Sequence, residues 1–105
     1  MYANMKNKKT QHIISRIEKI KLLLQGIGEM RPGSLTQQSV ILKSGNIYQP
    51  WQISYTHKMK SRTKGIKPEF VKQTKLQIEN YKKFKELTTE WVDLAIELAT
   101  LKMEI

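Results

Sequence analysis

The sequence predicts an α+β fold: an N-terminal helix, a small three-stranded antiparallel sheet, and a long C-terminal helix with a coiled-coil-like end. Apolar residues recur with helical spacing in two regions of the 105-residue chain. The segment between these regions alternates apolar and polar residues, as a half-buried strand does. Proline and glycine turns separate the three parts. The length suits a single domain with a helical extension.

The first predicted helix covers residues 11–28. Its apolar positions are spaced by three or four residues and form one stripe: Ile13, Ile17, Ile20, Leu24 and Ile27. Gly26 and Gly28 mark its end, because glycine readily adopts the left-handed conformation that closes a helix. Residues 1–10 are polar and basic, and we interpret them as a basic flexible arm, with a frayed start of this helix as the alternative.

Residues 29–67 are predicted to form the small basic sheet. Residues 35–43 form its expected first strand, after an Arg-Pro-Gly-Ser turn. Trp51, Ile53 and Tyr55 alternate with polar residues over 51–57, which is typical of a half-buried strand. A short basic connection leads to a returning strand over 61–66.

Residues 68–105 are predicted to form the long helix, which Pro68 opens because proline is favoured in a first helical turn. Its second half carries an apolar seam with coiled-coil spacing: Phe84, Leu87, Trp91, Leu94, Leu98 and Leu101. Either the stripe of the first helix covers this seam within the chain, or a second copy or larger partner does. We favour self-association. Thr88 and Thr89 leave open whether the helix is continuous, because β-branched residues lower helix propensity.

Charge is the strongest functional signal. The chain has a net charge of +10, and residues 30–68 contain seven Lys or Arg residues and no Asp or Glu. Such a field attracts polyanions. A solubilising surface would intersperse both signs, and a membrane-binding segment would place the cations along a helix, so we favour nucleic acid. Candidate contacts to base edges are Gln52, Ser54, Thr56, Arg62 and Lys64. Candidate contacts to phosphate are Arg31, Lys43, Lys58, Lys60 and Lys67.

Three aromatic residues bear on the choice between DNA and RNA. Trp51 and Tyr55 could stack on unpaired bases, but aromatic residues on the apolar side of a strand more often belong to the core. Tyr48 is the better candidate for an exposed ring. RNA as the direct ligand therefore remains an alternative to duplex DNA.

The composition argues against several other functional classes of protein. The chain has no cysteine, and its two histidines have no neighbouring carboxylate, so we expect no disulfide, metal or other cofactor. No paired acids and no phosphate-binding glycine loop are present, so we expect no catalytic residues and no enzyme. The start lacks an apolar signal segment and no stretch could span a membrane, which favours a cytoplasmic location.

The order of motifs resembles a family of small bacterial and archaeal proteins that has no assigned function and often lies beside or within transposase genes. Gly33 to Leu35 match its first motif, Arg62 with Thr63 fall near its basic strand, and Tyr81, Phe84 and Leu87 match its helical motif. The family's cysteine is missing, and Tyr48-Gln-Pro-Trp51 stands where His-Gly-Pro-Tyr is expected, so no metal role carries over. The order of parts also resembles the arm-binding domains of tyrosine recombinases, an analogy of fold alone.

These observations predict a non-enzymatic accessory protein of a mobile element that binds duplex DNA through its basic sheet and is dimeric or docks onto a larger enzyme. The alternative is a structural adaptor whose helices hold a larger protein or ribonucleoprotein.

Overall fold

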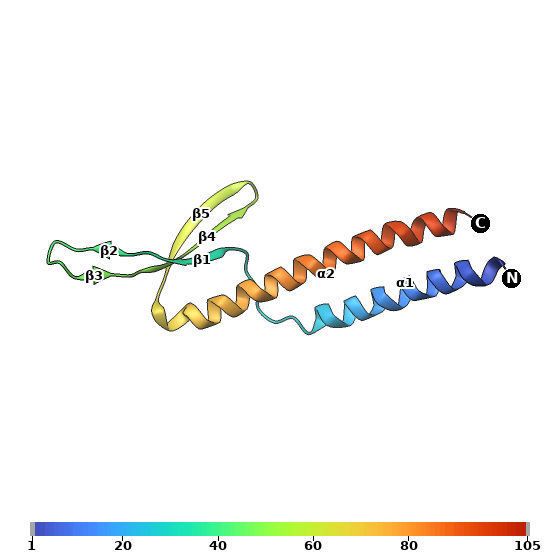
Figure 1. Cartoon of the computed structure of the whole chain (residues 1–105), viewed down its shortest axis with the longest axis horizontal. Helices are drawn as coiled ribbons and strands as arrows, with labels where there is room; N and C mark the ends of the chain where they lie inside the picture. The colour runs from blue at the N-terminus through green and yellow to red at the C-terminus, as the bar shows by residue number, and fades with distance from the viewer. Residues whose placement is uncertain (1, 105) are drawn as a thin grey trace. The chain divides into compact units, whose positions relative to one another are not determined.

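The computed structural model describes the backbone of residues 2–104 and the side chains of residues 7–104. Its fold is α+β, as the sequence predicts (Figure 1). The elements in chain order are α1 (Tyr2–Gln25), β1 (Ser34–Gln37), β2 (Val40–Ile41), β3 (Ile47–Tyr48), β4 (Trp51–His57), β5 (Lys60–Ile66), the 3-10 helix η1 (Pro68–Phe70) and α2 (Val71–Met103). The chain divides into two compact units, here called the helical unit (residues 1–27 and 83–105) and the sheet unit (residues 28–82).

Helix α1 is longer at its start than the sequence analysis predicted. It begins at Tyr2, so the flexible arm expected over residues 1–10 is helical wherever the structure describes it. Residues 2–10 contain neither glycine nor proline, so nothing there interrupts the helix. The helix ends at Gln25 rather than residue 28, where the Gly26 amide donates to the Leu23 carbonyl at 3.2 Å.

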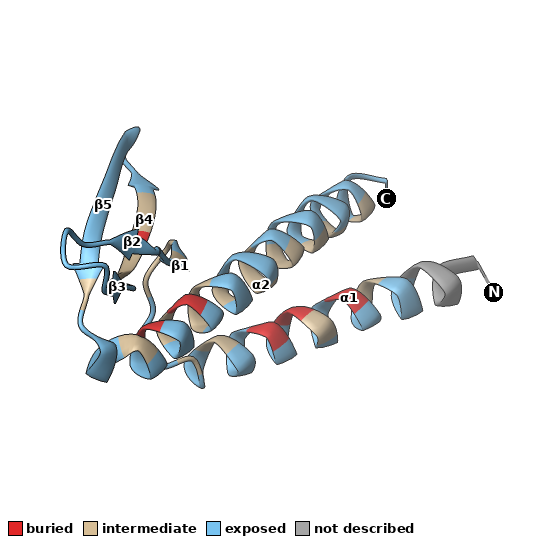
Figure 2. Ribbon diagram, turned by 60° about the vertical axis from the view of Figure 1, so that its left-hand side comes forward, coloured by how far each residue is buried: buried red, intermediate tan, exposed pale blue. Residues whose placement is uncertain are grey.

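The helical unit is an antiparallel pair formed by α1 and the second half of α2. Among the residues of this unit whose side chains are described, Ile13, Ile17 and Ile20 of α1 are buried. Figure 2 shows the buried parts of α1 in red. The predicted seam residues of α2 are only half-buried: Phe84, Leu87, Trp91, Leu94, Leu98 and Leu101. The apolar stripe of α1 therefore covers part of the α2 seam, and the rest of the seam stays accessible to solvent.

Helix α2 is continuous through Thr88 and Thr89. The Thr88 hydroxyl donates to the carbonyl of Phe84 at 2.8 Å and lies 3.2 Å from that of Lys85. This bond to the preceding turn satisfies the side chain without breaking the helix.

A paired charge links the two helices. The Arg16 guanidinium donates two hydrogen bonds to the Glu90 carboxylate, at 2.5 and 2.7 Å. These hydrogen bonds lower the pKa of Glu90 from its ordinary 4.5, against a smaller opposing effect of burial. Both side chains are more than one third exposed, so water screens the pair and its contribution to stability is small.

Because of this ion pair, we expect part of the protein's folding stability to be lost in acid. Because the pKa of Glu90 is lowered by folding, the stabilisation is fully present above pH 4.5 and is lost as pH falls through the lowered pKa. Glu90→Gln should therefore lower the melting temperature slightly at neutral pH and flatten its fall below pH 4.5, measured by circular dichroism. Glu86→Gln, on an exposed part of the same helix, is the control; an identical pH profile for both variants would contradict the assignment.

The sheet unit contains the predicted three-stranded antiparallel sheet, in the order β1-β4-β5. The first strand is shorter than predicted: pairing with β4 covers Ser34–Gln37, and residues 40–41 pair instead with β3. The Ser44-Gly-Asn turn closes this second, two-stranded sheet, with Gly45 at φ +88°. The strand after this turn was not predicted from the sequence, because two residues are too few to show alternation.

The hairpin of β4 and β5 closes through Lys58 and Met59. Both have positive φ, at 51° and 64°, as the two central residues of a type I′ turn do. The turn pairs His57 with Lys60 and so sets the register of the whole hairpin. Ile53, at the centre of β4, is completely buried, and Ile78 and Thr74 of α2 are the other buried residues of the sheet unit.

Candidate nucleic-acid interface

The register of the sheet separates its side chains into two faces, because residues directly opposite each other on neighbouring strands point the same way. One face carries only uncharged polar side chains and is here called the neutral face. Its members are Ser34, Thr36, Gln52, Ser54, Thr56, Ser61 and Thr63, with Gly65 at the end of β5. The opposite face is here called the mixed face.

The mixed face holds both the apolar residues and the strand cations. Arg62 pairs with Tyr55 and Lys64 pairs with buried Ile53, so both cations lie on the mixed face. The Lys75 ammonium of α2 lies 5.2 Å from the centre of the Trp51 ring. Helix α2 therefore covers part of this face. On the neutral face, Gln52 and Ser54 are half-buried and the other members are exposed.

This arrangement corrects the predicted grouping of base-contacting residues. The structure brings Gln52, Ser54 and Thr56 together, but it does not place Arg62 and Lys64 beside them. The alternation within each strand was identified correctly. The length of the turn decides which side chains of β5 share a face with which side chains of β4. With a two-residue turn, each even-numbered residue of β4 pairs with an odd-numbered residue of β5, so Thr63 rather than Arg62 or Lys64 lies opposite Ser54.

Hydroxyl groups dominate the neutral face. The hydroxyl oxygens of Ser54 and Thr63 are 3.3 Å apart, and those of Thr56 and Ser61 are 3.0 Å apart, in two cross-strand hydrogen bonds. A hollow of about 410 Å³ lies over the same strands. Each hydroxyl has one proton and two lone pairs, so a pair sharing one hydrogen bond keeps a donor and acceptors for a ligand.

The predicted phosphate-contacting cations are spread around the sheet rather than over the neutral face. Lys58 lies in the turn, Lys60 beside it, Lys67 after β5, and Lys43 at the tip of the second sheet; all four are exposed. Arg31 is half-buried, and its backbone amide donates to the Gln77 carbonyl at 3.1 Å. Strand β5, at the edge of the sheet, thus has cations at its turn and along its length.

The aromatic side chains differ in exposure. Tyr48 is 55% exposed on β3, while Trp51 and Tyr55 are half-buried. The expectation that Tyr48 is the exposed ring is confirmed. Trp51 packs beneath Lys75 and pairs with Ile66, as a residue at the margin of the core does.

Sequence reasoning missed four members of the neutral face: Ser34, Thr36, Ser61 and Thr63. Thr36 fell within the predicted strand over 35–43, Ser61 and Thr63 fell within that over 61–66, and Ser34 belonged to the predicted turn. The missing signal was the pairing: a two-residue turn after His57 would have placed Ser61 opposite Thr56 and Thr63 opposite Ser54.

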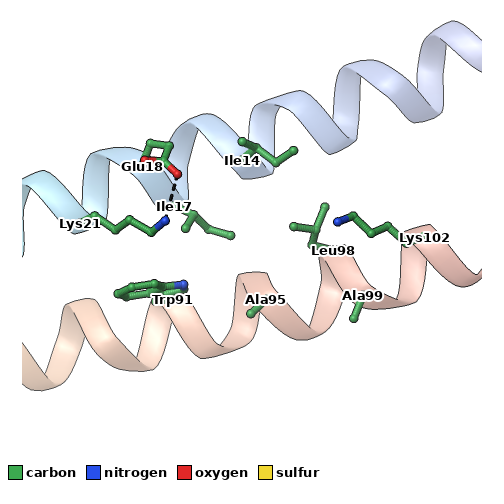
Figure 3. A pocket seen from close by; sticks show the side chains of 9 residues that line it. All are labelled: Ile14, Ile17, Glu18, Lys21, Trp91, Ala95, Leu98, Ala99 and Lys102. Atoms are coloured by element: carbon green, nitrogen blue, oxygen red, sulfur yellow. Dashed lines mark hydrogen bonds and ion pairs between the residues drawn. The ribbon is translucent and has the colours of Figure 1, made fainter.

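The helical unit presents a second surface, a groove of about 390 Å³ between its two helices (Figure 3). Ile14 and Ile17 of α1 and Trp91, Ala95, Leu98 and Ala99 of α2 line it. Glu18 and Lys21 lie at the end near Trp91, and Lys102 lies at the end near Leu98 and Ile14. The Lys21 ammonium is 5.5 Å from the centre of the Trp91 ring. Of the predicted partner residues, Trp91 and Leu98 contribute to this groove.

Comparison with known proteins found nothing similar: no family model, curated protein or solved structure matches the chain. The resemblance to a transposase-associated family stays a prediction. Among the described residues, no three His, Asp or Glu side chains are grouped to hold a metal ion. No helix in the described part of the chain combines the length and hydrophobicity of a membrane span.

Proposed function

We propose that the sheet unit binds duplex DNA through the neutral face, with the cations of β5 and its turn contacting phosphates. The observation that carries this proposal is the neutral face itself. It has seven hydroxyl or amide side chains on one largely exposed sheet surface, and its edge strand β5 is rich in cations. The other members of the proposed interface are Arg31, Lys43 and Lys67.

The dimensions and chemistry of the major groove support this arrangement. The groove admits a two-stranded ribbon, and its base edges offer donors and acceptors that hydroxyl and amide groups can match. Phosphates border the groove on both sides, so cations belong at the margins of the inserted element rather than at its centre. In this sheet the cations of β5 lie along one edge strand and project from the opposite face, so the proposal requires their long side chains to reach phosphates past that edge.

The test is fluorescence anisotropy with matched labelled duplex DNA, single-stranded DNA and structured RNA across a salt series. If about six phosphates are neutralised, the logarithm of the duplex affinity should fall with the logarithm of salt at a slope near −5. Much flatter duplex binding would contradict the proposal. Tighter binding to structured RNA would favour the RNA alternative.

A matched pair of substitutions tests which face meets the DNA. Thr63→Glu places a carboxylate within the neutral face, whereas Gln37→Glu places one on the mixed face of β1. Both lower the net charge by the same amount. We expect Thr63→Glu to weaken duplex binding by roughly tenfold or more, because a carboxylate is brought beside phosphates and unmatched base edges, and Gln37→Glu to have little effect. Equal losses would show that the neutral face is not the contact surface.

We also propose that the helical unit self-associates through its groove. The supporting observation is the apolar centre of the groove, formed by Ile14, Ile17, Ala95, Leu98 and Ala99. Its charged residues lie at the ends, where Glu18 is already paired with Lys21 at 3.0 Å. Ala95 and Ala99 allow a second helix to approach closely. A dimer would present two sheets to DNA, as expected of an accessory protein that acts with a larger enzyme in the cytoplasm.

Ile14 provides the test of self-association. It is 41% exposed and lines the groove, so Ile14→Lys should convert a dimer to a monomer without unfolding α1. Val92→Lys is the control, because Val92 is 57% exposed on α2 and does not line the groove. Sedimentation equilibrium measures the oligomeric state of both variants. A monomeric wild-type protein would contradict the dimer and would favour a larger protein as the occupant of the groove.

A further inference from the structure

A second hollow in the sheet unit has a composition unlike that of the neutral face. It encloses about 350 Å³ between the end of β5 and the start of α2. Three cations line it: Arg31, Lys64 and Lys67. None of its nine lining residues is acidic. This concentration of positive charge around a concave space favours an anionic ligand.

The hollow also offers an aromatic surface. Phe70, the last residue of η1, lines it and is 49% exposed, so part of its ring is accessible to a ligand. The Phe70 carbonyl accepts a hydrogen bond from the buried Thr74 hydroxyl at 2.8 Å, and its amide donates to the Lys67 carbonyl at 2.9 Å. These bonds hold the backbone of the exposed ring on both sides.

Two glutamine side chains complete the lining. The Gln77 amide nitrogen donates to the Glu29 carboxylate at 3.0 Å, which leaves its side-chain oxygen as the group free to accept from a ligand. Gln73 is exposed and carries both a donor and acceptors.

We propose that this hollow binds one unpaired nucleotide, with its base on Phe70 and its phosphate among the three cations. A nucleotide combines an anion, a flat ring and hydrogen-bonding edges, and the hollow provides a counterpart for each. Aromatic stacking of single bases is a general mode of binding unpaired nucleic acid. The nucleotide could come from a strand end next to the bound duplex or from free nucleotide in solution; the chemistry of the site is the same.

This inference depends on the proposed function only if the bound nucleotide belongs to the end of a DNA strand. The hollow lies on the mixed-face side of edge strand β5, opposite the neutral face. A strand end of a duplex bound to the neutral face therefore has to pass the edge of the sheet to reach it, and Arg31, Lys64 and Lys67 would contact its phosphates. The test must therefore separate binding of the duplex from binding of the extra nucleotide.

The experiment compares a blunt duplex with the same duplex carrying one 2-aminopurine nucleotide as a 3′ overhang. We expect the wild-type protein to bind the overhang duplex about fivefold or more tighter and to quench its fluorescence through stacking. Phe70→Ala should abolish both effects and leave blunt-duplex binding unchanged. Leu76→Ala is the matched control, because Leu76 is 62% exposed on α2 and does not line the hollow.

The outcomes separate the two claims. Equal affinity for both duplexes without quenching overturns the inference and leaves the proposed function standing. Quenching that depends on Phe70, together with weak binding of the blunt duplex, supports the hollow and removes the proposed duplex contact. Adenosine 5′-monophosphate is added as a competitor: if it reverses the quenching at low concentration, free nucleotide is the source, and if it does not, the strand end is.

Discussion

Replacing four cations of the β4–β5 hairpin together by glutamine is expected to weaken duplex DNA binding on the order of 10²–10³-fold near 0.15 M salt. The four are Lys58, Lys60, Arg62 and Lys64. Each cation that contacts a phosphate releases a condensed counterion, and this release is the main sequence-independent source of affinity. With four of about six contacts removed, the salt slope should change from near −5 to near −2. Anisotropy titrations at several salt concentrations measure both quantities.

The control for this variant is a set of four lysines in the helical unit replaced by glutamine, which changes the net charge by the same amount. Suitable exposed positions are Lys8, Lys19, Lys83 and Lys85. We expect this control to keep most of its affinity and nearly the wild-type slope. A loss as large as that of the hairpin variant would mean that total charge, rather than this surface, determines binding. Circular dichroism should show both variants folded, because all eight side chains are exposed.

Gly33→Ala is expected to be the most destabilising small substitution in the sheet unit. Gly33 has φ +144°, a conformation that L-residues rarely adopt. An added Cβ would lie 2.7 and 2.8 Å from the Cγ1 and Cδ1 atoms of Ile53 and 3.0 Å from the Ser54 carbonyl oxygen. Ile53 is completely buried and has little room to move. Backbone strain and overpacking together should cost about 2–4 kcal/mol, or a fall of roughly 10–20 °C in the melting temperature.

Gly45→Ala separates these two causes. Gly45 also has a positive φ, of +88°, but a Cβ there would meet nothing within 4 Å. We expect a cost of about 1 kcal/mol, from backbone strain alone. If thermal or urea unfolding gave the two variants equal stability, the contact between position 33 and Ile53 would not be tight.

Much of the fold could be predicted because its elements carry long, regular patterns. The stripe from Ile13 to Ile27 and the alternation over residues 51–57 each repeat several times, so neither depends on one residue. Strands β2 and β3, with two residues each, show no periodicity, and their exposed side chains carry no burial signal. The start of α1 was missed because its polar residues resemble both a flexible arm and an exposed helix.

The candidate interface was predicted in its residue types but not in its geometry. Arg62 and Lys64 were expected beside Gln52, and the register placed them on the other face. Alternation within one strand carries no information about a neighbouring strand until the turn between them is known. The nucleotide-sized hollow was beyond sequence reasoning for a similar reason: Arg31, Lys64 and Phe70 meet only through tertiary packing.

The turn between β4 and β5 carries a cost in stability, which the proposed phosphate contact of Lys58 would explain. Two residues with side chains occupy left-handed conformations there, where asparagine and glycine would be less strained. The chain thereby keeps a lysine at the tip of its hairpin, next to a methionine that is 98% exposed. A protein under selection for stability alone would have lost this pair easily, because better turn sequences are one or two substitutions away. The tip of the hairpin is therefore the place to look first for natural variation that trades affinity against stability.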